Sequence, residues 1–482
     1  MCRQNGEGIS TVTNHEAKTT ANGIPGAMAS VVYSKSLFGA MIFMVAIVGA
    51  SSIYANLSFA VTDELAYKYF PPFRKYINAN RVQHLGSEYY NIATSIVAGE
   101  GFANPFLNSQ TGPTAWMPPV LPCILAALLW LFNGNRAAVA AVVVILQVCV
   151  LIGTGMLILI LVRQTTTRIW ALAAASLFVV WLLADFRQWF QLTHDGWIIL
   201  LAIDLLTVGV CWYRPLNAWK HAAVWGLFGG LFAMINPILG VCWVIFSMAL
   251  MVKERERARF CVALVFATLA LAPWTVRNYL IFGRLIPVKS NLAYELYQSQ
   301  CVQKDGLLQD WVGHPQDGGG PEGSEYRAVG EMPYLDRKRE LFLQAVWADP
   351  KGFADRVAFR LLGATLWYVP FNRNEEARRP WVVWPYRLIY PLPLLSVIVL
   401  VVAAQFRPLH WAQWAVMGIY LLYLMPYVAV SFYERYATPL VGVKCLLVLW
   451  AADQLLSILF GARKQPEHTL KSAAQERPSH SI

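Results

Sequence analysis

Residues 137–162 read "AAVAAVVVILQVCVLIGTGMLILILV" and contain no charged side chain. At about 1.5 Å per residue, a helix of this length spans the hydrocarbon core of a bilayer, which is about 30 Å thick. Apolar segments recur along the chain at 37–60, 119–132, 137–162, 169–186, 196–213, 222–235, 238–252, 260–281, 386–404, 411–431 and 437–460. The pattern predicts an all-α polytopic membrane protein.

The overall composition agrees with this class, because 57% of the residues are hydrophobic and only 14% are charged. A net charge of +11 would suggest nucleic acid as the partner of a soluble protein. In a membrane protein, Lys and Arg in the cytoplasmic loops account for it. We therefore predict membrane lipid as the surroundings and no nucleic-acid partner.

Two apolar segments decide the number of spans. As a single helix, 222–252 would be about 46 Å long, and basic residues flank it on both sides, so we predict two spans that meet at Asn236-Pro237. Segment 119–132 is short for a span. If it lies along the membrane surface, the short inner loops carry nine Lys or Arg and the short outer loops carry two. This choice gives about ten spans with both termini inside.

The resulting organisation has an uncleaved signal anchor at 37–60 and two large outer regions. The predicted divisions are a cytoplasmic tail 1–36, a membrane module 37–281 with its first outer loop 61–136, a second outer region 282–385, C-terminal spans 386–460 and a cytoplasmic tail 461–482.

Short helices are predicted in both outer regions. Periodic apolar residues favour a juxtamembrane helix over 87–98 that ends at Gly99. The second region is expected to hold an amphipathic helix over 335–348 and an interfacial helix over 356–371. Residues 314–326 are Gly-rich and are predicted to form a flexible stretch.

Ionisable residues inside the spans are few, namely Asp204, Lys444 and Asp453. Such residues mark functional sites by default, although Asp204 and Lys444 could instead pair within the bundle. The outer surface is richer in charge. There the predicted topology collects Asp63, Glu64, Glu88, His194, Asp195, Arg277, Arg284, Lys289 and Arg435. This set suits a lipid phosphate held by cations beside an acid that acts as base, whereas each Arg alone is typical of a membrane anchor.

Three stretches resemble the C-type glycosyltransferases, which use lipid-linked sugars. They are "EYYNIATSIVAGEGF" (88–102) with "TGPTAWMPPVLPCILAALLWLFNG" (111–134), "APWTVRNYLIFGRLIPVKSN" (272–291) and "YERYATPL" (433–440). Among the branches of that superfamily, the sequence is most similar to the protein O-mannosyltransferases and the aminoarabinose transferases of lipid A.

The resemblance implies a multi-pass enzyme of the bacterial inner membrane whose active site faces the periplasm. It would transfer a hexose or a pentose from a polyprenyl phosphate donor to a glycan, lipid or protein acceptor. One carboxylate base and a single displacement predict inversion at the anomeric carbon, in contrast to the paired carboxylates of glycoside hydrolases.

The family's base is usually an Asp three to five residues before the tyrosine of the first juxtamembrane helix. Ser87, Gly86 and Leu85 hold those positions before Tyr90, so Glu88 becomes the first candidate. Asp63 and Glu64 form the second.

The family's other acid matches Asp195, which would orient the sugar or the acceptor. Candidate substrate-binding residues are Tyr89, Tyr90, His194, Arg277, Lys289 and Arg435. No cofactor is predicted with certainty, and a divalent cation that bridges carboxylate and phosphate stays open.

Two other functions compete with the transferase. A transporter or flippase of lipid-linked sugars would call for inverted repeats and charges at the membrane midplane, and no repeat is visible. A catalytically altered family member could instead serve as a membrane scaffold, because the usual Asp is replaced.

Overall fold

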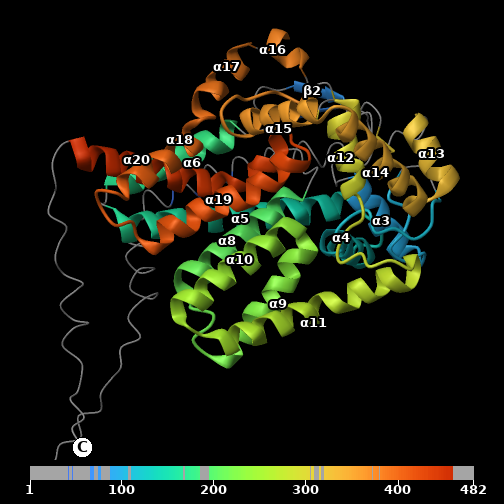
Figure 1. Cartoon of the computed structure of the whole chain (residues 1–482), viewed down its shortest axis with the longest axis horizontal. Helices are drawn as coiled ribbons and strands as arrows, with labels where there is room; N and C mark the ends of the chain where they lie inside the picture. Colours follow the sequence, from blue (N-terminus) through green and yellow to red (C-terminus); the bar gives the residue numbers. More distant parts are fainter. Residues whose placement is uncertain are drawn as a thin grey trace, which may run out of the picture.

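The computed structural model describes residues 66–69, 74–77, 87–106, 110–166, 169–184, 195–303, 305–308, 314–315, 320–371, 373–378 and 380–459, besides the single positions 39, 42 and 46. Within them the chain is an all-α polytopic membrane protein, as the sequence predicts (Figure 1).

Seven helical segments of the described chain are long and apolar enough to cross a membrane. They are α5 (Arg136–Thr165), α8 (Gly196–Val208) with η2 (Gly209–Tyr213), α10 (Pro237–Glu254), α11 (Arg257–Phe282), α17 (Pro380–Ile389) with α18 (Leu392–Ala403), α19 (Trp411–Val430), and η4 (Glu434–Leu440) with α20 (Val441–Leu459).

The predicted total of about ten spans stays a prediction. Helices α6 (Ile169–Ala184) and α9 (Trp219–Ile235) pack in the same bundle, but they are only 16 and 17 residues long. The first predicted span, 37–60, lies outside the described residues except for the three single positions.

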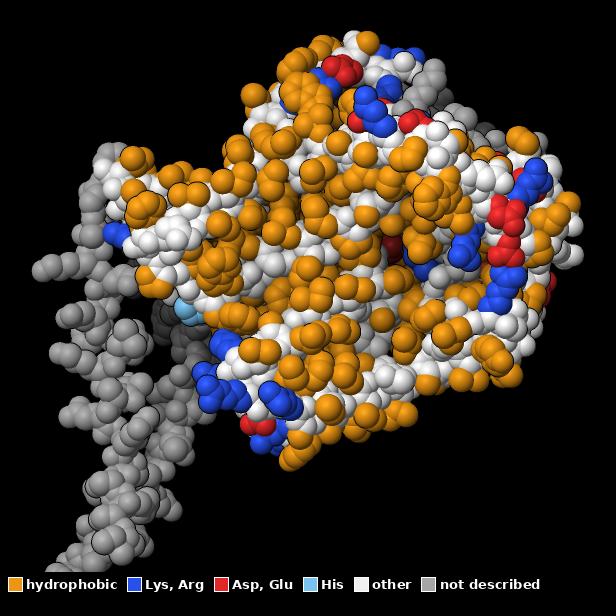
Figure 2. Space-filling model, in the orientation of Figure 1, with side chains coloured by type: hydrophobic (Ala, Val, Ile, Leu, Met, Phe, Trp, Pro, Cys, Tyr) orange, Lys and Arg blue, Asp and Glu red, His pale blue; other side chains and the backbone are white. Residues whose placement is uncertain are grey.

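Hydrophobic side chains cover the middle of the face in Figure 2, whereas charged side chains gather toward its edges. Helix α11 illustrates this arrangement, because basic residues cluster at its start, at 253–259, and Arg284 follows its end. Along the helix only Ala263 and Asn278 are buried. The remaining surface of α11 is suited to contact with lipid.

Helix α11 packs closely on α9 through small residues. A Cβ atom added at Gly226 would lie 2.2 Å from the carbonyl oxygen of Ala263, and one added at Gly230 would lie 2.6 Å from the Cβ of Ala270. Small residues therefore let the two backbones approach, as is common between membrane helices.

The predicted break in 222–252 is confirmed. Helix α9 ends at Ile235 and α10 begins at Pro237. Asn236 lies between them, and its side-chain oxygen accepts a hydrogen bond of 3.0 Å from the backbone N–H of Ile238. Asn as N-cap followed by Pro at the first helical position explains why a new helix begins here.

The first loop contains the predicted juxtamembrane helices and also a hairpin that the sequence did not predict. Helix α3 (Ser87–Val97) ends before Gly99, whose φ of 82° favours glycine, and it packs on α4 (Val120–Leu131). Helix α4 has 12 residues, or about 18 Å, which is too short to cross a bilayer. Strands β1 (Ala66–Tyr69) and β2 (Arg74–Ile77) pair antiparallel, with Ala66 opposite Ile77.

The second large region contains α12 (Leu292–Tyr297), η3 (Gln298–Val302), α13 (Pro321–Val329), α14 (Glu331–Ala348), α15 (Pro350–Thr365) and α16 (Asn374–Arg378). Helices α3, α4 and α12–α14 gather at one end of the molecule, which we call the loop-rich end (Figure 1).

Three predicted boundaries in this region were wrong. Pro321–Val329 is helical rather than flexible, because Pro321 occupies the first turn of α13. Helix α14 begins at Glu331, four residues earlier than predicted. Asp349-Pro350 does end α14, but Asp349 also caps the next helix, so α15 starts at Pro350 and ends at Thr365.

A buried carboxylate joins the two loop regions. Glu331 is 6% exposed and accepts hydrogen bonds from the backbone N–H of Ala115 at 3.0 Å and from the Ser290 hydroxyl at 2.6 Å. The hydroxyl groups of Thr114 and Tyr326 also donate to it. A side chain that satisfies donors from three segments should fix the loops relative to one another.

We expect Glu331→Gln to lower the free energy of unfolding by about 2–3 kcal/mol, because a neutral amide leaves some of these buried donors without an acceptor. Glu340→Gln is the matched control, since Glu340 is exposed on the same helix. Thermal unfolding of the purified proteins in detergent would measure both. Equal stability of the two variants would contradict the role of Glu331 as a clamp.

Candidate active site

The first turn of α3 places Glu88 at the loop-rich end. Its side chain is 15% exposed, and Oε1 lies 3.8 Å from Nε2 of His314. A carboxylate in the first turn of a helix is stabilised by the helix dipole and by free backbone N–H groups. Glu88, on the helix that the sequence predicted, therefore lies beside His314, which is more than two hundred positions away in the sequence.

Asp195 directly precedes α8 and meets α3 through Tyr89. The Tyr89 hydroxyl donates a hydrogen bond of 2.9 Å to Oδ2 of Asp195. Burial and the neighbouring Asp195 carboxylate raise the pKa of Tyr89 well above its ordinary value. Tyr89 thus remains a protonated donor, and it fixes the orientation of Asp195 relative to α3.

Arg435 and Glu295 complete the group from two other elements. The Arg435 guanidinium, on η4, lies over the rings of Tyr433 and Tyr436, with its carbon 5.1 Å and 5.7 Å from the ring centroids. Glu295, on α12, accepts a hydrogen bond of 2.7 Å from the Ser431 hydroxyl. The segment between α19 and α20 is thereby tied to α12.

Glu88, Asp195, Glu295, His314 and Arg435 together form what we call the Glu88 cluster. Burial raises the pKa of Glu88 above its ordinary value. The Arg435 guanidinium counteracts that rise, while the carboxylates of Glu295 and Asp195 add to it. The cluster therefore combines three acids with one guanidinium and holds Glu88 in a state that accepts a proton more readily than an exposed carboxylate.

Tyrosines enclose the cluster on the side of the membrane bundle. The rings of Tyr427 and Tyr436 stack with centroids 4.3 Å apart, and the Tyr427 hydroxyl accepts a hydrogen bond of 2.8 Å from Asn236. Burial raises the pKa of Tyr433. Aromatic walls with a few oriented polar groups are typical of small-molecule sites.

The structure brings together four of the residues that the sequence singled out, namely Glu88, Tyr89, Asp195 and Arg435. Tyr90, like Tyr89, is buried in the hydrophobic core, and its role in substrate binding stays a prediction. Asp63, Glu64 and His194 lie outside the described residues.

Arg277 has a different environment. Its Nη1 donates to the carbonyl oxygen of Thr114 at 2.7 Å, and its Nη2 donates to that of Phe102 at 2.8 Å. Within the described chain, no hydrogen bond or ion pair joins Arg277 or the half-buried Lys289 to the Glu88 cluster. Arg277 therefore stabilises the first loop through its bonds to two backbone carbonyls, and neither Arg277 nor Lys289 is assigned to the Glu88 cluster.

Sequence reasoning missed His314 and Glu295. His314 packs edge-on against the rings of Phe106, Trp116 and Tyr294, with centroids 6.0, 6.4 and 5.3 Å away. It occurs in a Gly-rich stretch that was predicted to be flexible. A His beside the Pro of such a stretch was the one available signal, and it is a weak one.

Burial and the nearby Arg435 lower the pKa of His314 from 6.5 to about 4. In the unfolded chain this His binds its proton more readily, so stability is complete above pH 6.5 and is lost as the pH falls toward 4.

We expect the free energy of unfolding of the wild-type protein to fall by up to about 3 kcal/mol through this group as the pH is lowered. His314→Gln has no group that titrates at this position, so its stability should not show this loss. Unfolding at pH 7 and pH 4.5 would compare them. The same pH dependence in both proteins would contradict a neutral, buried His314.

Among the residues that the structure describes, no group of three or more His, Cys, Asp or Glu side chains could hold a metal ion. The divalent cation that the sequence left open has no candidate site within that part of the chain.

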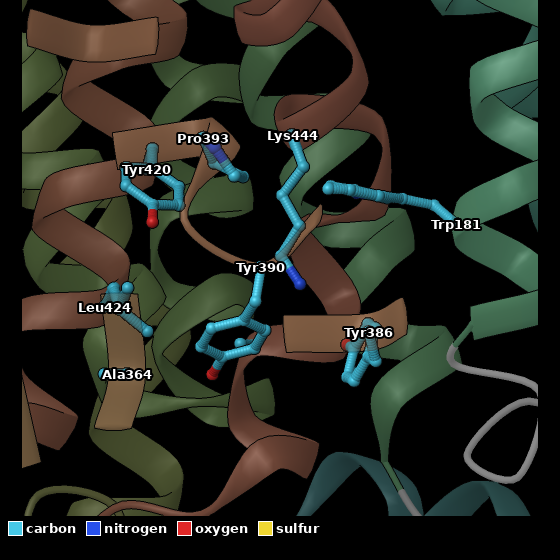
Figure 3. A pocket seen from close by; sticks show the side chains of 9 residues that line it. Trp181, Ala364, Tyr386, Tyr390, Pro393, Tyr420, Leu424 and Lys444 are labelled. Carbon is cyan, nitrogen blue, oxygen red and sulfur yellow. The ribbon is translucent and has the colours of Figure 1, made fainter. Parts of the chain in front are cut away.

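Asp204 on α8 and Lys444 on α20 are ionisable residues inside the bundle. Oδ2 of Asp204 accepts a hydrogen bond of 2.5 Å from the Thr154 hydroxyl. Figure 3 shows the Lys444 side chain extending toward Tyr386 and Tyr390, in a cavity of about 10 Å³ that has room for about one water molecule. The interaction found for Asp204 among the described residues is with Thr154, so the suggested pairing with Lys444 stays a prediction. The cavity is too small for a sugar.

Comparisons with protein-family models, with curated proteins and with solved structures found no match to this chain. The geometry of the Glu88 cluster and the resemblance of the sequence motifs are therefore what bears on function.

Proposed function

We propose that this chain is an integral-membrane glycosyltransferase that moves a sugar from a polyprenyl phosphate donor to an acceptor. The observation that carries the proposal is the Glu88 cluster, in which Glu88 and Asp195 lie beside Arg435 among buried tyrosines. Glu88 and Arg435 come from two of the stretches that resemble the C-type glycosyltransferases, Asp195 matches that family's other acid, and the proposal gives each a chemical role.

Glu88 is the general base in this proposal. An acceptor hydroxyl is a weak nucleophile, so removal of its proton in the transition state accelerates attack. A base is most effective when its pKa lies near the working pH. The raised pKa of buried Glu88 supports this assignment over an exposed carboxylate.

The reaction is a single displacement. The acceptor oxygen attacks the anomeric carbon and forms the new glycosidic bond, while its proton passes to Glu88. The bond from the anomeric carbon to the phosphate oxygen breaks, and the polyprenyl phosphate leaves with the electron pair. One displacement inverts the configuration at that carbon.

Arg435 is proposed to bind the donor phosphate. Its guanidinium can form two parallel hydrogen bonds with phosphate oxygens, and these bonds strengthen as the leaving group gains charge. Asp195, oriented by Tyr89, would accept a hydrogen bond from a sugar or acceptor hydroxyl. The tyrosine rings would pack against the sugar.

The proposed location is the bacterial inner membrane, with the loop-rich end in the periplasm. The short loops on the other side carry most of the Lys and Arg that flank the spans, which favours this orientation. Acceptor and donor would meet where α3 lies at the membrane surface.

A transfer assay tests the proposal against its alternatives. Purified protein in lipid vesicles would receive a polyprenyl phosphate sugar labelled in the sugar, together with membranes that supply acceptors. We expect label to leave the donor and to become covalently attached to an acceptor. Movement of intact donor across the vesicle membrane without transfer would identify a flippase. Neither transfer nor transport would favour a scaffold.

A further inference from the structure

Two arginines on one face of α15 lie apart from the Glu88 cluster. Arg356 and Arg360 are four residues apart, so their side chains neighbour each other on the helix. Helix α15 packs on α19, and the loop that contains Gly306 packs against both arginines. A Cβ atom added at Gly306 would lie 2.8 Å from the Cβ of Arg356 and 3.0 Å from Nη1 of Arg360.

Arg360 has a structural role that occupies only part of its guanidinium. The side chain is fully buried; its Nε donates to the carbonyl oxygen of Val428 at 2.7 Å and its Nη2 donates to that of Ala429 at 3.1 Å. These carbonyls belong to the last turn of α19, where carbonyl groups have no N–H partner within the helix. The third nitrogen, Nη1, is buried without a hydrogen-bond partner.

Arg356 adds a second cation with unused donors. Its Nε and Nη1 are buried and have no hydrogen-bond partner. Asp305, in the loop that contains Gly306, is already occupied, because its Oδ2 accepts from Arg373 at 3.0 Å and its Oδ1 accepts from the backbone N–H of Leu307 at 3.0 Å. Two neighbouring guanidinium groups with no acidic partner among the described residues are costly to bury.

An anion would satisfy this pair, and a phosphate group suits it best. Guanidinium groups bind phosphate oxygens through short, charge-assisted hydrogen bonds. The same helix exposes the apolar side chains of Phe359, Leu361 and Leu362, which are 52%, 43% and 41% exposed. A helix with basic and exposed apolar residues is typical of the membrane interface, where lipid phosphates lie.

We propose that Arg356 and Arg360 bind the phosphate group of an acidic membrane lipid at a site separate from the Glu88 cluster. The bound lipid would stabilise the end of α19, since Arg360 already holds the carbonyls there. The segment that follows α19 carries Ser431 and Arg435, so the lipid would help to fix the position of the residues around Glu88.

Lipid binding to the purified full chain tests this proposal. Protein in neutral detergent would be titrated with phosphatidylglycerol, with phosphatidylcholine and with inorganic phosphate, and bound lipid would be counted by native mass spectrometry. Arg356→Gln removes one cation without touching the bonds that cap α19. Lys351→Gln is the matched control, because Lys351 is exposed in the first turn of the same helix.

We expect wild-type protein to bind phosphatidylglycerol in preference to phosphatidylcholine. Arg356→Gln should weaken that binding about tenfold or more, and Lys351→Gln should change it less than twofold. A second variant, Arg356→Lys, keeps the charge and packing but loses the planar fork, and we expect binding between those of wild type and Arg356→Gln.

Equal binding by wild type and Arg356→Gln would overturn the proposal. So would a phosphatidylglycerol signal that inorganic phosphate displaces fully at millimolar concentration, because the site would then recognise a free anion rather than a lipid. Sugar transfer is not used as the readout, so the proposed function and the lipid site can fail independently.

Discussion

Replacing Glu88 with Gln is expected to lower the turnover of sugar transfer by about 10²-fold or more. Gln keeps the size of the side chain and its capacity for hydrogen bonding, but it cannot take the proton from the acceptor hydroxyl. Donor binding should change little, because the phosphate is bound by Arg435. Steady-state kinetics with varied donor, together with a direct donor-binding measurement, would separate the two effects.

The matched control is Glu100→Gln, at the other end of the same region. Glu100 is exposed and accepts a hydrogen bond of 2.7 Å from Asn104, and the proposal gives it no part in proton transfer. Its turnover should stay close to that of wild type.

In the wild-type protein, turnover should rise with pH as Glu88 loses its proton. Because the pKa of Glu88 is raised, this rise should occur above the ordinary carboxyl value of 4.5. Full activity of Glu88→Gln would move the base elsewhere, to Asp63 or Glu64 first.

Replacing Arg435 with Lys is expected to lower turnover or donor affinity by about 10-fold to 100-fold, or about 1–3 kcal/mol. Lys keeps the charge but replaces the planar fork with a single ammonium group, which cannot bind two phosphate oxygens in parallel. It also loses the stacking of the guanidinium on Tyr433 and Tyr436. Kinetics at varied donor concentration would measure the loss.

Arg284→Lys provides the comparison for Arg435. Arg284 forms two hydrogen bonds of 2.7 Å with Asp336, but its side chain is 50% exposed. An exposed ion pair of this kind contributes little, so both stability and donor affinity should stay near wild type. Wild-type kinetics for Arg435→Lys would show that Arg435 only supports the tyrosines around it, and the phosphate site would have to be sought elsewhere.

The sequence predicted those features that depend on neighbouring residues. Asn236-Pro237 ends one helix and starts the next because both signals are local. The end of α3 before Gly99 follows in the same way, from the need for a positive φ. Long apolar runs identified the membrane class because a bilayer requires a minimum length of hydrophobic helix.

Roles that depend on contacts between distant parts of the chain could not be predicted from the sequence. The Gly-rich composition around His314 predicted flexibility, yet the ring is buried between aromatic side chains from three other segments. Arg277 and Arg435 carry the same charge near the outer ends of predicted spans, so they could not be distinguished from the sequence. Only the fold shows that the first donates to backbone carbonyls while the second lies beside acids.

The location of the donor phosphate tests the central claim most directly. A polyprenyl phosphate with a photoreactive group near its phosphate would be cross-linked to purified protein in lipid, and the labelled peptides would be identified by mass spectrometry. We expect labelling in 87–97 and 431–440, and loss of that labelling with excess unreacted polyprenyl phosphate. Labelling confined to other segments, or labelling that excess lipid does not reduce, would contradict a donor site at Glu88 and Arg435.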